Sequence, residues 1–138
     1  MRQVNSRNLY RVVDANFNRT KEALRVCEDV SRFVLDDKVL TKQFKTIRHQ
    51  VTSLIDQFQL KTLIGARNIA GDVGKQTSKQ ELTRKQFSDI FYANLQRSKE
   101  SIRVLEEFSK LYQSQLAISF KRLRYQLYAL EKKAPSKF

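Results

Sequence analysis

The chain has little glycine and little proline: its 138 residues include three glycines and one proline. Both residue types destabilise helix interiors, glycine through its backbone entropy and proline through its missing N–H. Pro135 lies close to the end of the chain, and all three glycines fall between positions 65 and 74. Alternating apolar and polar residues, the mark of strands, are also missing. The sequence therefore predicts helices on both sides of the glycine-containing stretch.

Cysteine and histidine are equally scarce, with one of each. Cys27 has no partner for an internal disulfide, and its position on an apolar stripe predicts a buried, reduced thiol. His49 stands alone, so no cluster of cysteine and histidine has the spacing of a metal site. These absences disfavour zinc enzymes and enzymes that use a cysteine nucleophile.

Long apolar runs are missing as well. No segment approaches the roughly 20 apolar residues that a membrane-spanning helix needs, and no signal-peptide pattern opens the chain. These features predict a cytoplasmic protein with no membrane partner. The length predicts a single domain, 1–138.

Acidic residues are too few to balance the basic ones. The chain carries 27 Lys and Arg residues against 14 Asp and Glu residues, which gives a net charge of +13. A charge of this size attracts phosphate-bearing partners. Nucleic acids, anionic membranes and nucleotides all belong to that class.

A long segment rich in polar residues occurs twice in the chain. Residues 15–28 read ANFNRTKEALRVCE, and residues 93–106 read ANLQRSKESIRVLE. A second pair follows, FKTIRHQ at 44–50 and FKRLRYQ at 120–126. The repeat period is about 77 residues, far longer than a solenoid repeat. Between the two copies, the polar residues match better than the apolar residues do. The repeated polar groups are therefore predicted to act as a set.

Apolar residues at spacings of three and four run along four segments, which predicts amphipathic helices. The predicted fold is all-α, an antiparallel helical bundle built from two duplicated helical hairpins joined by a glycine-containing connector. Ser78-Lys79-Gln80-Glu81 has the pattern of a capping box and is predicted to begin the third helix. The predicted boundaries are 6–58 for the first half, 59–78 for the connector, 79–132 for the second half and 133–138 for the tail.

Four duplicated polar residues are predicted to point inward. On helical wheels Asn16 falls within the first apolar stripe and Arg19 beside it, and Asn94 and Arg97 occupy the matching places in the second half. The two pairs are predicted to converge near a pseudo-twofold axis. A buried guanidinium needs a partner. Two partners remain open: an internal network with Glu106 and Glu28, or a bound anion.

Arg25 and Arg103 fall on the opposite side of their helices. Asp29 and Glu107 lie four residues further along, so simple ion pairs along the helix surface are predicted for both arginines.

The connector 64–75 is the second concentration of polar chemistry. Its glycines allow backbone N–H groups to approach an anion, Arg67 and Lys75 add positive charge, and Asp72 is a candidate ligand for magnesium. The segment lacks the spacing of a P-loop and the strand that precedes one. An ordinary connection between helices is the simpler interpretation.

Taken in order along the chain, these residues resemble a small family in thiamin biosynthesis. Its members are free-standing or fused ahead of thiamin phosphate synthase. The resemblance covers nearly the whole chain. It departs at Asn68, where the family often has an aspartate after the arginine. The matching motifs are DANxxRxxEALRVxED at 14–29, LDD at 35–37, RH at 48–49, Arg67, GDVG at 71–74 and ANxxRxxExxRVLEE at 93–107.

The resemblance implies an enzyme, a phosphomethylpyrimidine kinase. It would use ATP and Mg²⁺ to convert 4-amino-5-hydroxymethyl-2-methylpyrimidine phosphate to its diphosphate. The acceptor oxygen of such a reaction is already anionic, so catalysis needs cationic groups and a metal more than a strong base. The chain offers such groups. The predicted catalytic residues are Arg19, Arg97 and Asp72; the predicted substrate and phosphate ligands are Asn16, Asn94, Arg48, Arg67, Arg124 and Lys75; the predicted metal ligands are Asp72, Glu28 and Glu106.

Two other functions remain open at this stage. The chain is alternatively a non-catalytic partner of thiamin phosphate synthase. A basic helical bundle also suits nucleic acid, but this requires an exposed basic face, and the inward placement of Arg19 and Arg97 argues against it. The partners predicted from the sequence are a small phosphate substrate, a nucleotide and the synthase, with a homodimer also possible.

Overall fold

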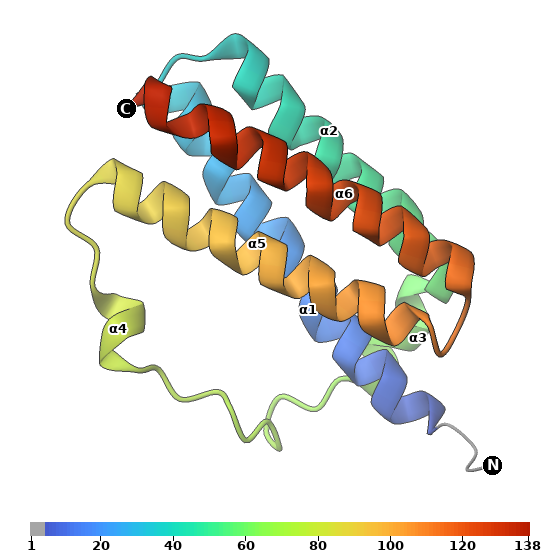
Figure 1. The fold of residues 1–138 in the computed structure, drawn as a ribbon. Coiled ribbons are helices and arrows are strands. Elements are labelled where there is room, and N and C mark those ends of the chain that lie inside the picture. The colour runs from blue at the N-terminus through green and yellow to red at the C-terminus, as the bar shows by residue number, and fades with distance from the viewer. Residues whose placement is uncertain (1–4) are drawn as a thin grey trace.

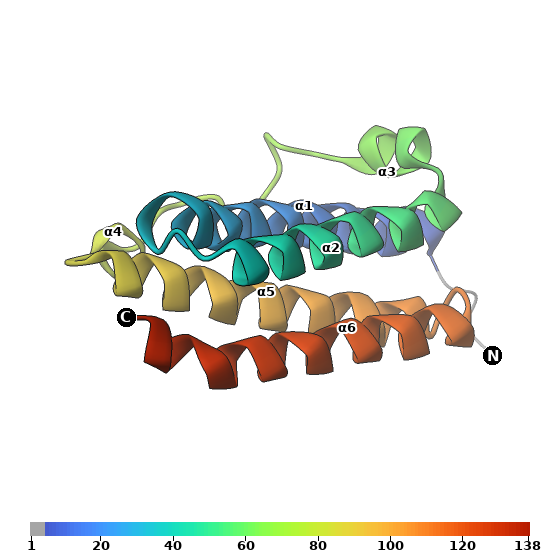
Figure 2. The same cartoon turned by 90° about the horizontal axis from the view of Figure 1, so that it is seen from above.

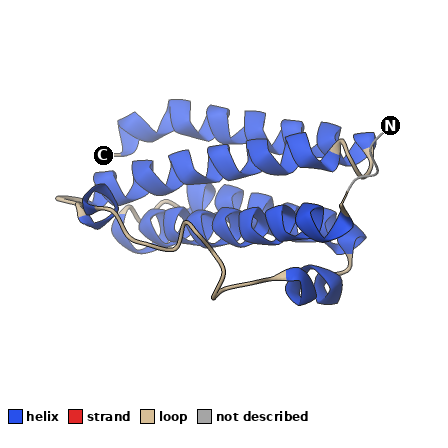
Figure 3. Ribbon diagram, turned by 90° about the horizontal axis from the view of Figure 1, so that it is seen from below, coloured by secondary structure: helices blue, strands red, loops and turns tan. Residues whose placement is uncertain are grey.

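The computed structural model describes residues 5–138, and every regular element in that range is a helix (Figure 3). The predicted all-α bundle is therefore confirmed. None of these helices is both long and apolar enough to cross a membrane. The elements are α1 (Ser6–Asp29), the π-helical turn η1 (Val30–Val34), α2 (Lys38–Ile55), the 3-10 turn η2 (Asp56–Phe58), α3 (Leu60–Ala66), α4 (Lys79–Leu82), α5 (Phe87–Ser109), α6 (Ser114–Lys133) and the 3-10 turn η3 (Ala134–Lys137).

The four long helices form a bundle in which α1 and α5 pack most extensively (Figure 1). Each of these helices also packs on the second helix of its own hairpin, α1 on α2 and α5 on α6, and α2 meets α6 along the remaining edge (Figure 2). At the crossing of α1 and α5, Thr20 Oγ1 donates a hydrogen bond of 2.6 Å to Ser101 Oγ. Small side chains at this point let the two central helices approach closely.

The core lies between the four helices and is built from equivalent residues of the two hairpins. Phe44 of α2 and Phe120 of α6 stand at matching places in the repeat, and both are fully buried. Phe44 meets Phe91 of α5 edge to face, with ring centroids 5.7 Å apart. Burial of each ring contributes roughly 1.5–3 kcal/mol to stability. Cys27 is buried, as predicted, and desolvation raises the pKa of its thiol. It lies next to the backbone carbonyl of Phe91.

The third long helix begins later than predicted. The capping-box sequence at 78–81 opens only α4, four residues long and fully exposed. With no apolar face to bury, this turn gains nothing from tertiary packing. The N-terminal cap of α5 lies closer to the C-terminus than this sequence, at Gln86 and Asp89. The side chain of Asp89 accepts hydrogen bonds from the backbone N–H groups of Lys85 and Gln86, so α5 begins at Phe87.

The second helix starts from an aspartate cap. Asp37 Oδ1 accepts a hydrogen bond of 2.9 Å from the backbone N–H of Leu40, and Asp37 Oδ2 lies 3.0 Å from Nζ of Lys137. The backbone hydrogen bond and the lysine lower the pKa of Asp37 below its usual value. This cap therefore ties the last turn of the chain to the start of α2.

Candidate functional site

The duplicated charged residues form two copies of one buried ion cluster. Glu28 of α1 is 3 % exposed and accepts hydrogen bonds from Nε and Nη2 of Arg48 on α2, at 3.3 and 3.2 Å. Glu106 of α5 is 4 % exposed and accepts from Nε of Arg124 on α6 at 3.0 Å. Each cluster thus joins the two helices of one hairpin.

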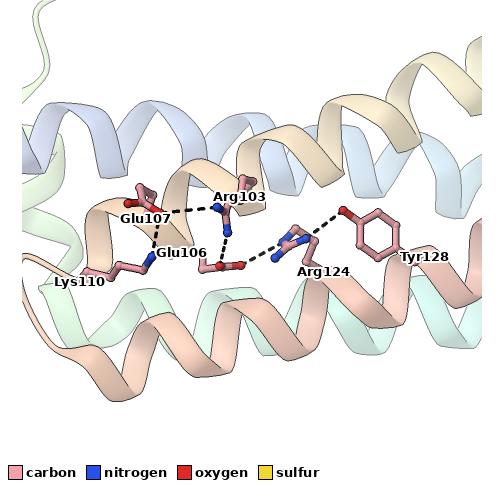
Figure 4. A network of polar contacts seen from close by, with 6 residues as sticks. All are labelled: Arg103, Glu106, Glu107, Lys110, Arg124 and Tyr128. Atoms are coloured by element: carbon pink, nitrogen blue, oxygen red, sulfur yellow. Dashed lines mark hydrogen bonds and ion pairs between the residues drawn. The ribbon is translucent and has the colours of Figure 1, made fainter.

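Each cluster includes a second arginine from the same helix as the glutamate. Arg25 lies 3.5 Å from Glu28, and Arg103 donates a hydrogen bond to Glu106 (Figure 4). Arg25 also pairs with Asp29 at 3.4 Å, and Arg103 with Glu107 at 3.8 Å, so these two surface pairs are confirmed.

The internal network of Arg19 and Arg97 with these glutamates, one of the two alternatives left open by the sequence, is wrong. Arg19 and Arg97 do not point inward; both are exposed, and neither forms an ion pair within the described residues. The apolar stripe is bordered at this level by Thr20 and Ser101, which meet across the interface. The long stems of the two arginines carry their guanidinium groups to water, as such side chains commonly do. Arg48 and Arg124 supply the buried counter-charges.

Asn16 and Asn94 do not converge either. The side chain of each donates to a carbonyl one turn back in its own helix, Asn16 to Val12 at 2.9 Å and Asn94 to Ile90 at 2.8 Å. The helices α1 and α5 run antiparallel and cross where Thr20 lies opposite Ser101. Asn16 precedes that crossing point in α1, and Asn94 precedes it in α5, so the two asparagines lie on opposite sides of it.

One cavity does gather residues from the first half of the repeat and the connector. Its volume is about 840 Å³, and its walls are the outer side of α1, the first residues after α3 and one residue of α5. Of the predicted site residues, Asn16, Arg19, Arg67 and Asp72 line it, whereas Asn94, Arg97, Arg48, Arg124, Lys75, Glu28 and Glu106 do not. The lining residues are Asn8, Arg11, Val12, Asp14, Ala15, Asn16, Asn18, Arg19, Glu22, Arg67, Asn68, Ile69, Asp72 and Val104.

An ion pair between Asp14 and Arg67 holds the connector against α1. Nε and Nη2 of Arg67 donate to the two carboxylate oxygens of Asp14 at 2.7 and 2.8 Å. Asp14 is 3 % exposed and also accepts from Asn18. The hydrogen bonds to Asp14 raise the pKa of the Arg67 guanidinium further above its ordinary value.

Arg11 and Asp14 line the cavity but were not predicted as site residues. The counterpart of Asp14 in the second half is Tyr92, so a search for duplicated polar residues passed over it. The sequence feature that could have revealed Asp14 is a carboxylate on the buried side of α1, directly before Ala15-Asn16. The facing wall of the cavity is made by the connector that follows the first hairpin.

Two short turns shape the connector at the cavity wall. Asn68 Oδ1 accepts a hydrogen bond from the backbone N–H of Gly71 at 2.9 Å, and Asp72 Oδ1 accepts from that of Gly74, also at 2.9 Å. A Cβ atom on Gly71 would lie 2.5 Å from Asn68 Nδ2, so this turn requires glycine or a shift of Asn68. The amide oxygen of Asn68 is therefore the acceptor that closes the first of these turns. Lys75 reaches the carbonyl of Ala70 instead of the cavity.

The cavity wall combines three guanidinium groups with carboxylates and amides. Arg11, Arg19 and Arg67 supply positive charge, and Asp14, Glu22 and Asp72 supply carboxylates, of which Asp14 is paired with Arg67. Guanidinium groups suit phosphate oxygens in charge and geometry. Within residues 5–138 no group of three or more Asp, Glu, His or Cys side chains could by itself hold a metal ion.

A model of one protein family matches residues 11–133. The chain belongs to the ThiD2 family. It is also similar to proteins named thiamine-phosphate synthase. The identity is 37 % over 131 residues with the protein of Rhodopirellula baltica, covering 94 % of this chain and 35 % of that protein. It is 39 % over 124 residues with the protein of Nostoc punctiforme, covering 89 % and 34 %.

The chain therefore spans about a third of the length of these curated relatives. The protein of Gloeobacter violaceus shows the same proportion, with 33 % identity over 97 % of this chain and 38 % of that protein. No solved structure gives a significant match.

Proposed function

We propose that this chain acts in thiamin biosynthesis as a phosphate-handling domain that works beside thiamine-phosphate synthase. Membership of the ThiD2 family and similarity to about a third of each synthase support the pathway. The cavity between α1 and the connector, with its three arginines, supports the handling of phosphate. This cavity is the single observation that carries the proposal that the domain handles phosphate.

The finer proposal is that the domain is a kinase that converts hydroxymethylpyrimidine phosphate to its diphosphate with ATP. The acceptor oxygen belongs to a phosphate monoester and is anionic near neutral pH, so the reaction needs no strong base. It requires two mutually repelling phosphoryl groups to be held in line while charge on the transferred group is offset. Arg19 lines the cavity from α1 and Arg67 from the connector, and both are proposed for that role, with Asp14 orienting Arg67.

The carboxylates on the wall fit magnesium in its usual protein environment, where one or two carboxylates combine with substrate phosphates. Asp72 is the proposed ligand, with Glu22 on the same wall. Glu28 and Glu106 are engaged by two arginines each, which leaves them poorly suited to a metal. Bound magnesium would supply positive charge to the phosphate oxygens.

A second candidate function is favoured by the comparisons themselves. Because the matched relatives are named for the synthase, the domain is alternatively a non-catalytic partner that docks on that enzyme. The two functions differ in one respect: only the kinase turns over substrate in the absence of the synthase.

The test incubates the isolated chain with ATP, Mg²⁺ and hydroxymethylpyrimidine phosphate, and measures the diphosphate. Turnover of the phosphate and not of unphosphorylated hydroxymethylpyrimidine is expected, since the arginines use the acceptor phosphate as a handle. Equal turnover of both acceptors would contradict this specificity. No turnover of either, together with capture of thiamine-phosphate synthase in a pull-down, would establish the partner function instead.

The repeat offers a matched pair of variants. Arg19→Met removes a cavity arginine, and Arg97→Met removes its counterpart outside the cavity. If Arg19 stabilises charge in the transition state, its variant loses about 30- to 1000-fold in rate, which corresponds to roughly 2–4 kcal/mol. Arg97→Met should retain activity close to that of the unaltered chain. Equal losses in both variants would refute the location of the site.

A further inference from the structure

The positive charge of the protein is concentrated on two of its four long helices. α2 and α6 together carry nine Lys and Arg residues and a single acidic residue, Glu131. α1 and α5 carry eight basic and eight acidic residues. The central helices are therefore neutral, and a large part of the net charge lies on the two helices that meet along the far edge of the bundle.

Most of these cations form no ion pair within the described chain. Arg48 and Arg124 are used internally by Glu28 and Glu106, and Glu131 pairs with Lys99 of α5. The other seven are exposed and form no ion pair among residues 5–138. Together they are called the α2–α6 basic face. It consists of Lys38, Lys42, Lys45, Lys121, Arg122, Lys132 and Lys133.

The cations of each helix point the same way. Lys38, Lys42, Lys45 and His49 fall within about 60° of arc on α2 at 100° per residue. On α6 the four exposed cations fall within about 120°. Like charges this close repel one another and destabilise the free protein slightly. An anionic partner would relieve this repulsion between the cations when it binds, so the face is suited to such a partner.

Two depressions lie on this face. One, of about 690 Å³, is lined by Lys38, Lys42, Lys45 and His49, with Asp36 and Asp37 at one end. The other, of about 350 Å³, lies between α2 and α6 with Lys42 and Lys133 on its rim. Lys42 and Thr46 line both, so the two depressions are neighbours on either side of these α2 residues, and the second one reaches α6.

Exposed aromatic rings stand among the cations of α6. Tyr125 is 55 % exposed and Tyr128 40 % exposed, with ring centroids 5.6 Å apart. Lys121 lies over the Tyr125 ring at 5.8 Å. Both rings lie outside the two depressions, beside the cations of α6. Single-stranded nucleic acids are bound by basic surfaces that follow the backbone together with aromatic faces for the bases. An acidic protein surface would need the cations but not the rings.

We propose that the α2–α6 basic face binds single-stranded nucleic acid through its phosphate backbone, with Tyr125 stacking on a base. α2 has 18 residues and spans about 27 Å, enough for a site of several nucleotides. The sequence argued against nucleic acid because Arg19 and Arg97 were predicted to be buried. The structure removes that argument and shows a separate basic face away from the cavity.

The experiment measures fluorescence anisotropy of labelled single-stranded DNA and RNA of about 12 nucleotides. Binding to the full chain is expected to weaken steeply as salt rises from about 50 to 200 mM. The test variant is the triple charge reversal K42E/K45E/K133E. The matched control is K61E/K79E/K85E, which changes the net charge equally at exposed positions on and around α3 and α4. Circular dichroism confirms that both variants fold.

The face variant is expected to lose at least about 30-fold in affinity and to show a smaller salt slope, while the control loses less than about fivefold. Tyr125→Ala should lose about 5- to 100-fold with little change in the salt slope, because it removes stacking and no charge.

Three results would overturn the proposal. Equal losses in the two triple variants would show a net-charge effect without a site. Absence of saturable binding near 150 mM salt would exclude a functional contact. Equally tight binding of poly-glutamate would assign the face to an acidic protein. Kinase turnover, measured on the same variants, is expected to be unaffected, so the outcome does not depend on the proposed function.

Discussion

Removal of Arg124 should destabilise the fold far more than removal of Arg97. Arg124 is 12 % exposed in its side chain, donates to Glu106 at 3.0 Å and to the hydroxyl of Tyr128 at 2.9 Å. Replacement by Met leaves the buried carboxylate of Glu106 with Arg103 as its remaining partner. Breaking a buried ion pair from one side costs about 3–5 kcal/mol, and the retained arginine places the expected loss near the lower end, about 3 kcal/mol.

This loss corresponds to a measurable change in the melting temperature. For 138 residues, an unfolding entropy of about 2.1 cal/mol/K per residue amounts to about 0.29 kcal/mol/K. The expected fall in Tm for Arg124→Met is therefore about 10 °C. Arg97→Met should shift Tm by less than about 2 °C, because that side chain is exposed and lies outside any ion pair of the described region.

The assay is thermal unfolding followed by circular dichroism at neutral pH. A third variant, Arg124→Met with Glu106→Gln, separates the two sources of the loss. If the stranded carboxylate is responsible, removal of its charge should recover part of the lost stability. The reasoning would be refuted by a fall below about 3 °C for Arg124→Met, by equal falls for the two arginines, or by no recovery in the double variant.

Three further predictions concern the cavity, the cap and the thiol. Asp14→Asn should fold, yet show less thermal stabilisation by ATP and Mg²⁺, because Arg67 loses its bidentate partner; unchanged stabilisation would contradict this. Asp37→Asn keeps the cap but loses the charge that Lys137 stabilises. The lowered pKa of Asp37 contributes stability above its ordinary value of 3.8, and this is lost as pH falls through the lower value in the folded protein. The Tm difference from the unaltered chain should therefore be present at pH 7 and vanish in acid, and a difference that persists in acid would refute the assignment. Cys27 should react with a thiol reagent only after unfolding, since burial raises its pKa; prompt reaction of the native protein would show that it is accessible.

The sequence alone was sufficient for the features that depend on local geometry. The near absence of glycine and proline, with apolar residues at spacings of three and four, correctly predicted an all-α bundle. The pairs of Arg25 with Asp29 and of Arg103 with Glu107 were also correct. Residues four apart on a helix are neighbours whatever the helix packs against.

The tertiary structure decided which polar groups meet between helices. Glu28 and Glu106 bind Arg48 and Arg124 because α2 and α6 lie beside them, whereas Arg19 and Arg97 reach water. A helical wheel places a residue near the edge of a stripe but does not show where its long side chain ends.

The cavity likewise depends on tertiary structure. Asp14 and Arg67 are 53 positions apart in the sequence, and only the return of the connector along α1 brings them together. The α2–α6 basic face depends in the same way on two helices from different halves of the repeat lying side by side. Helical periodicity follows from the geometry of one segment, but contacts between segments depend on where helices cross and in which direction they run, which periodicity does not contain.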